Sequence, residues 1–391
     1  MNHTKLLFLW ICMLIVMILF QYVLDKNRKI SKHCLIRNTI ILFSIQKYTN
    51  TKQIFYLIIP FIIEFIIEYY HSKGISIDPL ENKVKNMYSY FSIFWSPCMG
   101  KNDDLTEGKF DNNISKDFDD AQRDKKLELV ALSGASKNVK ILEVGCGNGS
   151  LLSYIKDTGA DVYGITISKE QYELCKQKGL PVGLINFFDL DESHNAKYDS
   201  IICSGVIEHL PNVSNRQDIE VFYKNLFFRF QRLLNPHSTI KKIIITCIHF
   251  RDYTKLTDPW SRFNIYMLER ANGGWYPTDK DCLVRSANQY FNLEYRRDIT
   301  NDYYISTYHW AKKFIEKGPK TLLYQLVNSI INFVNNPYYI HIIIEKLYSW
   351  QWQFSDKNHS ILWDLLKGKL QSNLHVTNSP VIHQLLVFKM K

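Results

Sequence analysis

The sequence predicts an α/β protein built on a doubly wound, mostly parallel sheet, and three observations carry that prediction. From about residue 139, short apolar runs that suit buried strands alternate with helix-length amphipathic segments. A glycine-rich turn directly follows the first of these runs. Finally, 46% apolar and 22% charged residues are a globular balance, which excludes a disordered or collagen-like chain.

The first two strands and the helix between them can be placed directly. VKILEV at 139–144 suits a buried strand, SLLSYIKDTG at 150–159 suits a helix that ends at a glycine, and DVYGIT at 161–166 suits a second strand. Further strands are expected at 182–188, 199–204 and 242–248. Because ligands of such sheets bind at the carboxyl ends of the strands, we expect the chemistry to collect there.

The glycine turn is the first candidate site. Gly145, Cys146, Gly147 and Gly149 lie in the run GCGNG, and Glu143 precedes the run by two residues. A dinucleotide-binding turn would read GxGxxG, with an acid about 20 positions later to hold the ribose. No acid occurs at 164–168, which argues against NAD. We infer S-adenosylmethionine instead, with the glycine turn against it and Glu143 shaping the loop near its amino-acid end.

The amino-terminal region predicts membrane attachment. The segment 6–24 is 19 residues long without a charge, close to the length that spans a bilayer. A cleaved signal peptide is the alternative, but the stretch exceeds a usual signal core and no small-residue cleavage site follows. Basic residues follow instead, so we expect a single-pass anchor with the remainder of the chain on the cytosolic side. A basic excess beside apolar segments favours a membrane surface, and nucleic acid is not expected as a partner.

The remaining organisation follows from composition. The apolar stretch 54–70 contains Pro60, Glu64 and Glu68, which favours an interfacial or packed helix over a second span. We therefore expect an anchor at 1–24, a basic and apolar membrane-proximal helical segment at 25–84, and a catalytic domain at 85–391. The eight cysteines are scattered without a CxxC pair, which indicates free thiols in a reducing compartment and no metal site.

Several blocks of the chain resemble one family, the cyclopropane-fatty-acid synthases and mycolic-acid methyltransferases, which also includes the coclaurine N-methyltransferases. The blocks span roughly residues 85 to 390. They are AQ with KK at 121–126, ILEVGCGNGSL, GITISKEQ at 164–171, SGVIEHL at 204–210, DPW at 258–260, the run YISTYHW at 304–310 and the ending QLLVFK. The resemblance implies a Rossmann-like class I methyltransferase sheet, with helical insertions that cover the substrate.

For the cofactor, the resemblance implies a further set of contacts. Thr166, Ser168 and Gln171 would hydrogen-bond S-adenosylmethionine in place of the usual ribose carboxylate. Asp189, at the end of the run LINFFD, would lie near the adenine amino group. The alternative for Asp189 is a solvated loop acid or helix cap.

For the reaction, the resemblance implies a bound bicarbonate held by a Cys, a Glu, a His and a Tyr in the cyclopropane-forming members. Glu208 and Tyr304 match this pattern, while Cys98 lies one position later than the pattern would place it. Thr246 stands where the family has its His, and His249 is three residues further on. Without that imidazole, the anion would be held by Thr246 and backbone alone, or not at all.

Three products remain open at this point: a methyl or methylene branch on an acyl chain, a cyclopropane, or a methylated amine. For an amine, Glu208 and His209 would act as an electrostatic and general-base pair; packing on the loop is the alternative for His209. The leading hypothesis is a membrane-anchored methyltransferase of unsaturated phospholipid acyl chains. An amine N-methyltransferase and a non-catalytic membrane protein are the alternatives. Aromatic-rich helical patterns at 319–370 suit core packing or an acyl-chain pocket.

Overall fold

A computed structural model describes residues 84, 88, 100–101, 104, 106–211, 213, 216–257, 261, 265, 275–316 and 379–391. The predicted anchor at 1–24, the stretch 54–70, Cys98, the DPW block and the helical patterns at 319–370 lie outside these residues. Within the described ranges, no helix combines the length and the apolar character needed to cross a bilayer.

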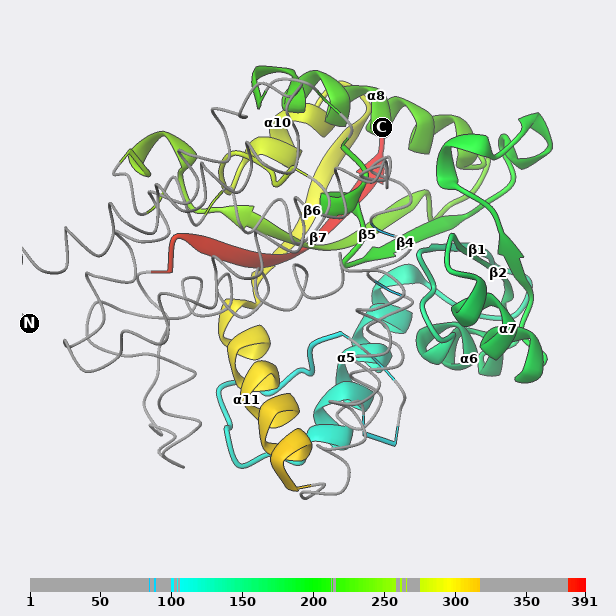
Figure 1. The fold of residues 1–391 in the computed structure, drawn as a ribbon. Helices are drawn as coiled ribbons and strands as arrows, with labels where there is room; N and C mark the ends of the chain where they lie inside the picture. The colour runs from blue at the N-terminus through cyan, green and yellow to red at the C-terminus, as the bar shows by residue number, and fades with distance from the viewer. Residues whose placement is uncertain are drawn as a thin grey trace, which may run out of the picture.

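Seven strands form one sheet in the order β3-β2-β1-β4-β5-β7-β6. The first five strands pair in parallel, while β7 is antiparallel to both of its neighbours, β5 and β6. The mostly parallel, doubly wound sheet is therefore confirmed, and the last strand of the chain is inserted next to β5 (Figure 1). The strands are β1 Lys140–Val144, β2 Asp161–Thr166, β3 Val182–Leu184, β4 Ser200–Ser204, β5 Lys242–Phe250, β6 Phe291–Asp298 and β7 Val381–Met390.

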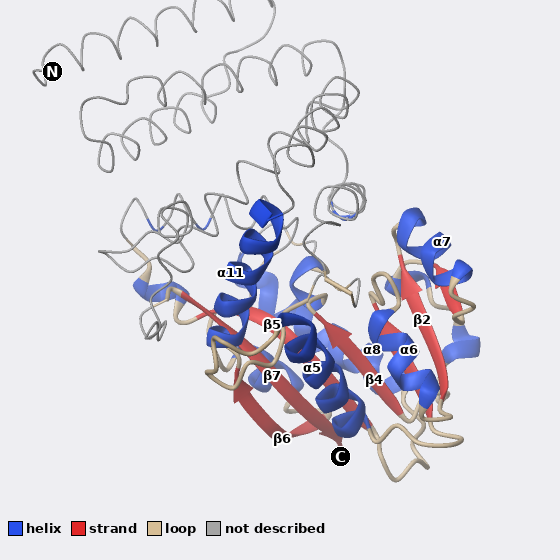
Figure 2. Ribbon diagram, turned by 90° about the horizontal axis from the view of Figure 1, so that it is seen from below, coloured by secondary structure: helices blue, strands red, loops and turns tan. Residues whose placement is uncertain are grey.

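Helices cover both faces of the sheet. In Figure 1, α8 and α10 lie on one side of the strands, and α5 and α11 lie on the other; Figure 2 shows α5 and α11 from below, crossing β5 and β7. One apolar core lies under α8 and α10, and another lies under α5 and α6. The helices are α5 Phe118–Ser133, α6 Ser150–Asp157, α7 Lys169–Gln177, α8 Ile219–Leu233, α10 Cys282–Ala287 and α11 Thr300–Glu316, with short 3₁₀ turns at Phe187–Asp189, Glu192–His194, Ile207–His209, Arg216–Asp218 and Tyr253–Lys255.

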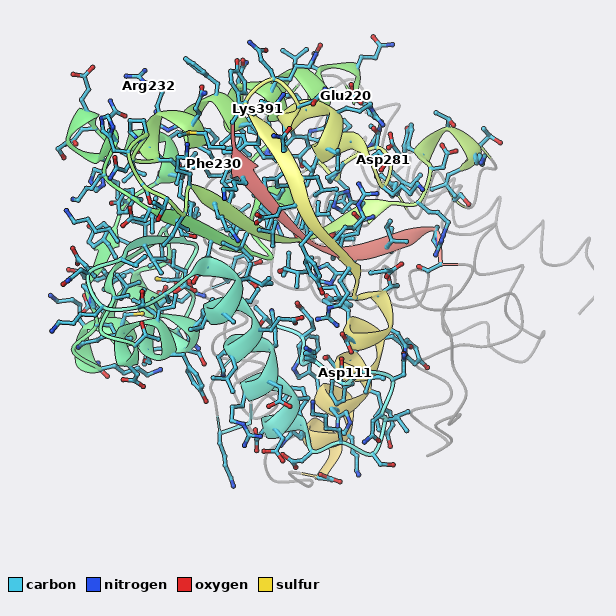
Figure 3. All side chains as sticks on the ribbon, turned by 180° about the vertical axis from the view of Figure 1, so that it is seen from behind. Asp111, Glu220, Phe230, Arg232, Asp281 and Lys391 are labelled. Carbon is cyan, nitrogen blue, oxygen red and sulfur yellow. The ribbon has the colours of Figure 1, made fainter. Side chains whose placement is uncertain are left out.

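The local sequence explains these elements. Asp117 is the N-cap of helix α5, and its carboxylate accepts hydrogen bonds from the backbone N–H groups of Asp119 and Asp120. Gly134 caps the other end in a left-handed conformation. Helix α8 is amphipathic: Phe230 is fully buried against the sheet, and Arg232, two residues later, faces solvent (Figure 3). The central strands are buried on both faces, which is why they read as continuous apolar runs.

One predicted element is shorter than expected. Strand β3 ends at Leu184, whereas the sequence suggested a strand over 182–188. The side chain of Asn186 accepts a hydrogen bond from the backbone N–H of Phe188, and the chain turns there into the 3₁₀ turn Phe187–Asp189. The apolar sequence therefore continues beyond Leu184, where the hydrogen-bonded pairing of β3 with β2 ends.

Candidate functional site

A cavity of about 430 Å³ opens at the carboxyl ends of the parallel strands. Its volume lies in the range of small-molecule sites. One end is bounded by the glycine turn and the end of β2, and the other by the turn after β4 together with side chains from α11 and β7. The polar and aromatic lining residues include Tyr88, Glu107, Lys125, Lys126, Glu143, Gly145, Cys146, Gly147, Thr166, Ser168, Gln171, Asn186, Ser204, Glu208, His209, Tyr276, Tyr303 and His383.

The glycines of the turn serve different purposes. All three have positive φ, which favours residues without Cβ. A Cβ on Gly147 would meet no atom within 4 Å, so this backbone faces the open cavity. Gly145 also lines the cavity, but its Cβ would meet Val206 at 2.5 Å. Gly149 was expected to bind the cofactor, yet it is not among the lining residues. Its Cβ would meet Leu180 at 2.4 Å, so Gly149 lets α6 pack against the neighbouring loop.

The side chain of Glu143 on β1 lines the cavity, and its buried carboxyl group is not fully hydrogen-bonded by the residues that the structure describes. It is 4% exposed, and its Oε2 has no hydrogen-bond partner among the described residues. Burial raises the pKa of Glu143 well above its usual value, and the nearby carboxyl of Asp104 adds to the effect. A buried acceptor without a partner costs free energy, so its retention beside a cavity indicates a ligand that donates a hydrogen bond or carries positive charge.

The three polar residues predicted after β2 form one hydrogen-bonded group on the cavity wall. The Thr166 hydroxyl donates to Gln171 Oε1 at 2.8 Å, and the backbone N–H of Ser168 donates to the Thr166 hydroxyl at 3.2 Å. Ser168 is also the N-cap of α7, since its hydroxyl accepts from the backbone N–H of Gln171. All three are at most 5% exposed and line the cavity. Their orientations are therefore fixed before a ligand arrives.

Asp189 does not reach this wall. It lies at the end of the 3₁₀ turn, is exposed, and is absent from the residues that line the cavity. Strand β3 stops at Leu184, and the contact of Asp189 with the adenine end stays a prediction. Asn186 lines that end of the cavity instead.

Glu208 lies at the opposite end, on the 3₁₀ turn that follows β4. It is 3% exposed, and burial raises its pKa to about 7, although nearby backbone N–H groups and the Cys247 thiol act to lower the pKa. One oxygen, Oε2, has no partner among the described residues. His209 also lines the cavity, and its Nε2 lies 2.8 Å from the hydroxyl of Tyr88. Both residues are therefore at the site, as the sequence suggested.

The tyrosine on α11 that faces the cavity is Tyr303. Tyr304, the residue expected at the reacting centre, is 2% exposed but is not a lining residue. Successive side chains on a helix point about 100° apart, so a shift of one position moves the hydroxyl away from the cavity. The Tyr303 ring packs edge-on against the His383 ring at a centroid distance of 4.9 Å.

The other predicted reacting residues are elsewhere. Thr246 shares a hydrogen bond of 3.0 Å with the Ser204 hydroxyl and does not line the cavity. His249 is fully buried, with Nδ1 placed 3.3 Å from the carbonyl oxygen of Asp279 and outside the cavity. Neither supplies the missing imidazole. Cys98 lies outside the described residues.

The cavity also holds three ionisable residues, two of which the sequence did not indicate. Lys125 on α5 forms an ion pair of 2.8 Å with Glu107 and donates to the Ser204 hydroxyl at 3.1 Å. Burial of Glu107 acts to raise its pKa, but the Lys125 ammonium outweighs that effect and lowers the value to about 2. His383 from β7 completes the group. The KK block signalled Lys125, but nothing in the local sequence pointed to Glu107 or His383.

The residues at the glycine-turn end fit S-adenosylmethionine. The backbone of Gly147 faces open space, fixed hydroxyl and amide groups follow β2, and a buried carboxyl without a full set of partners stands beside them. These groups suit a ligand with an ammonium group and sugar hydroxyls. No cluster of His, Cys, Asp or Glu among the described residues could hold a metal ion.

Comparisons with known proteins also find methyltransferases and cyclopropane synthases. The model of the family described as "Mycolic acid cyclopropane synthetase" matches residues 78–334. The cyclopropane-fatty-acyl-phospholipid synthase of Escherichia coli (strain K12) is 24% identical over 201 residues, covering 50% of this chain and 47% of the relative. The ubiquinone biosynthesis O-methyltransferase of Proteus mirabilis (strain HI4320) is 36% identical over 84 residues, covering 19% of this chain and 34% of the relative. The chain thus spans less than half the length of these curated relatives.

Solved structures share the fold. The cyclopropane synthase MmaA2 from Mycobacterium tuberculosis superposes with a TM-score of 0.59 at 14% identity, covering 81% of this chain and all (100%) of that one. The mycolic acid cyclopropane synthase CmaA1, complexed with SAH and CTAB, gives 0.57 at 15% identity, covering 81% and 99%. A coclaurine N-methyltransferase bound to N-methylheliamine and SAH gives 0.54 at 12% identity, covering 97% and 100%. At these identities the likeness establishes the methyltransferase-type fold.

Proposed function

The chain belongs to the mycolic acid cyclopropane synthetase family, as its sequence blocks indicated, and from this premise we propose that it is an S-adenosylmethionine-dependent methyltransferase. Its proposed acceptor is the double bond of an unsaturated phospholipid acyl chain. One observation carries the proposal: a single cavity joins the glycine turn and the hydroxyls after β2 to the buried Glu208 and Tyr303. A donor and an acceptor can therefore meet inside one cavity.

The donor end is assigned to four groups of this chain. The backbone of Gly147 gives room for close approach, Thr166 and Gln171 supply hydrogen-bonding groups, and Glu143 offers a carboxyl oxygen to a positively charged group. S-adenosylmethionine supplies a methyl group that its sulfonium already activates. The protein consequently has to align the two reactants and exclude water, more than to activate either one.

At the acceptor end, the lining combines aromatic rings with a few polar groups. Tyr88, Tyr276 and Tyr303 line the same cavity as Glu208. Electron-rich ring faces and a buried carboxyl stabilise positive charge in a dry cavity, which is the charge that an alkene develops when it is methylated. An acyl chain fits this environment better than a strongly hydrated acceptor.

We also propose that the enzyme works at a membrane, with its catalytic domain on the cytosolic side. The uncharged segment 6–24 and the basic residues that follow it support this proposal. The buried cysteines 146, 175, 203, 247 and 282 are free thiols, which suits a reducing compartment.

Lipid mass spectrometry tests the proposed function. The full chain and its Gly147→Asp variant would be expressed in a bacterial strain that lacks its own cyclopropane synthase, grown with methyl-labelled methionine. We expect labelled acyl chains heavier by one CH₂ with the wild type and none with the variant, and fragmentation would distinguish a ring from a branch. Unlabelled lipids together with labelled small amines would instead assign the chain to amine methylation, and equal labelling by both proteins would refute the cofactor site.

A further inference from the structure

His383 occupies an unusual position in the cavity. It is 4% exposed, lines the cavity, and has no hydrogen-bond partner for either ring nitrogen among the described residues. Two buried nitrogens without partners cost free energy that packing alone does not require. The cost is understandable if a reacting molecule in the cavity supplies the missing contact.

Strand register explains how this side chain reaches the site. His383 on β7 pairs with Ile248 on β5, and paired residues on neighbouring strands project from the same face of the sheet. Ile248 lines the cavity, so His383 shares its face. His249, the next residue on β5, pairs with Ile382 and therefore projects from the other face. A second imidazole, besides that of His209, thus reaches the cavity from β7.

The surroundings suit a base that is neutral at rest and charged after it accepts a proton. Burial lowers the pKa of His383 to about 4, so the ring is neutral near pH 7. The Glu107 carboxylate favours the protonated ring and Lys125 opposes it. The edge-on Tyr303 ring holds the imidazole in place.

Resting on the proposed function, we propose that His383 is a catalytic residue that accepts the proton released after methyl transfer. The alkene electron pair forms a bond to the methyl carbon while the bond from that carbon to sulfur breaks and its electron pair stays on the sulfur, which leaves a positive charge on the other alkene carbon. A C–H bond of the added methyl group then breaks, its electron pair closes the ring, and the proton moves to a lone pair on the imidazole. The resulting imidazolium returns its proton to water after product release. Even a weak base suffices, because a carbocation is a very strong acid.

Chemical rescue tests this role. The full chain would be assayed on dioleoyl phosphatidylglycerol vesicles with labelled S-adenosylmethionine. His383→Ala should lower turnover about 100-fold, the usual size of a general-base contribution, without changing the affinity for S-adenosylmethionine measured by calorimetry. Added imidazole should raise the turnover rate of His383→Ala at least about tenfold, because imidazole can enter the space that the side chain vacates. The matched control is His249→Ala, an equally buried histidine on the other face, whose rate imidazole should not change.

Two outcomes would overturn the proposal. One is a His383→Ala rate within about threefold of the wild-type rate. The other is a reduced His383→Ala rate that imidazole does not raise while His383→Gln retains full activity.

A second measurement does not depend on knowing the acceptor. In the ¹⁵N-histidine-labelled full chain, the ring signals of His383, assigned by their loss in His383→Gln, should shift when S-adenosylhomocysteine and dodecyltrimethylammonium are added together. Unmoved signals would overturn the role of His383. An inactive wild type whose signals still shift would refute the lipid acceptor but not the histidine.

Discussion

Replacing Glu208 by glutamine should make the protein more stable at alkaline pH while it impairs catalysis. Burial raises the pKa of this carboxyl from 4.5 to about 7. Below pH 4.5 the group is protonated in both states and contributes nothing. Between pH 4.5 and 7 the unfolded chain releases the proton while the folded chain keeps it, so stability falls as pH rises. Above pH 7 the penalty is constant at about 3 kcal/mol, at 1.36 kcal/mol per pH unit.

The glutamine variant removes this dependence because its side chain does not ionise. Urea unfolding at pH 5 and pH 8 should therefore show the difference in unfolding free energy between variant and wild type growing by about 2–3 kcal/mol in favour of the variant. Comparing the two proteins at each pH cancels the other titrating groups. Glu192→Gln, which alters an exposed carboxylate, is the control and should show no such growth. Parallel stability profiles for Glu208→Gln and wild type would refute the assignment of a buried, ionisation-resistant carboxyl.

Three further changes probe the rest of the cavity. Gly147→Asp should abolish S-adenosylmethionine binding in calorimetry, because its side chain and charge would enter space that is open in the structure; normal affinity would contradict the cofactor site. Lys125→Met should cost about 3–5 kcal/mol in urea unfolding at pH 7 by leaving the Glu107 carboxylate buried without its ion pair. Adding Glu107→Gln should recover much of that loss, and additive losses would contradict the coupling. Tyr303→Phe should lower methyl transfer more than Tyr304→Phe does, and the reverse order of rates would restore the expectation drawn from sequence.

The sequence by itself was sufficient for the parts of the site that are built locally. The glycine turn directly follows β1, Thr166 is the last residue of β2, and Ser168 lies two residues later. Strand ends of this kind can be recognised from apolar runs and turn residues. Strand β2 was predicted with the bounds that the structure has. Because parallel strands bring their carboxyl ends to one edge, these separate blocks could be placed at one cavity without coordinates. Family membership followed from the same blocks.

Only the tertiary structure decided which side chains share the reacting end. Tyr303 and Tyr304 are adjacent on α11 and point in different directions, and only Tyr303 lines the cavity. A short sequence block does not show which of two adjacent helix residues faces a cavity. Gly149 faces a packed loop because of how α7 and its following turn lie against α6. His383 reaches the cavity because β7 lies antiparallel beside β5. Glu107 lies at the cavity as the ion-pair partner of Lys125 on α5. These contacts join residues far apart in the chain, and so the register of the sheet and the packing of helices determine them.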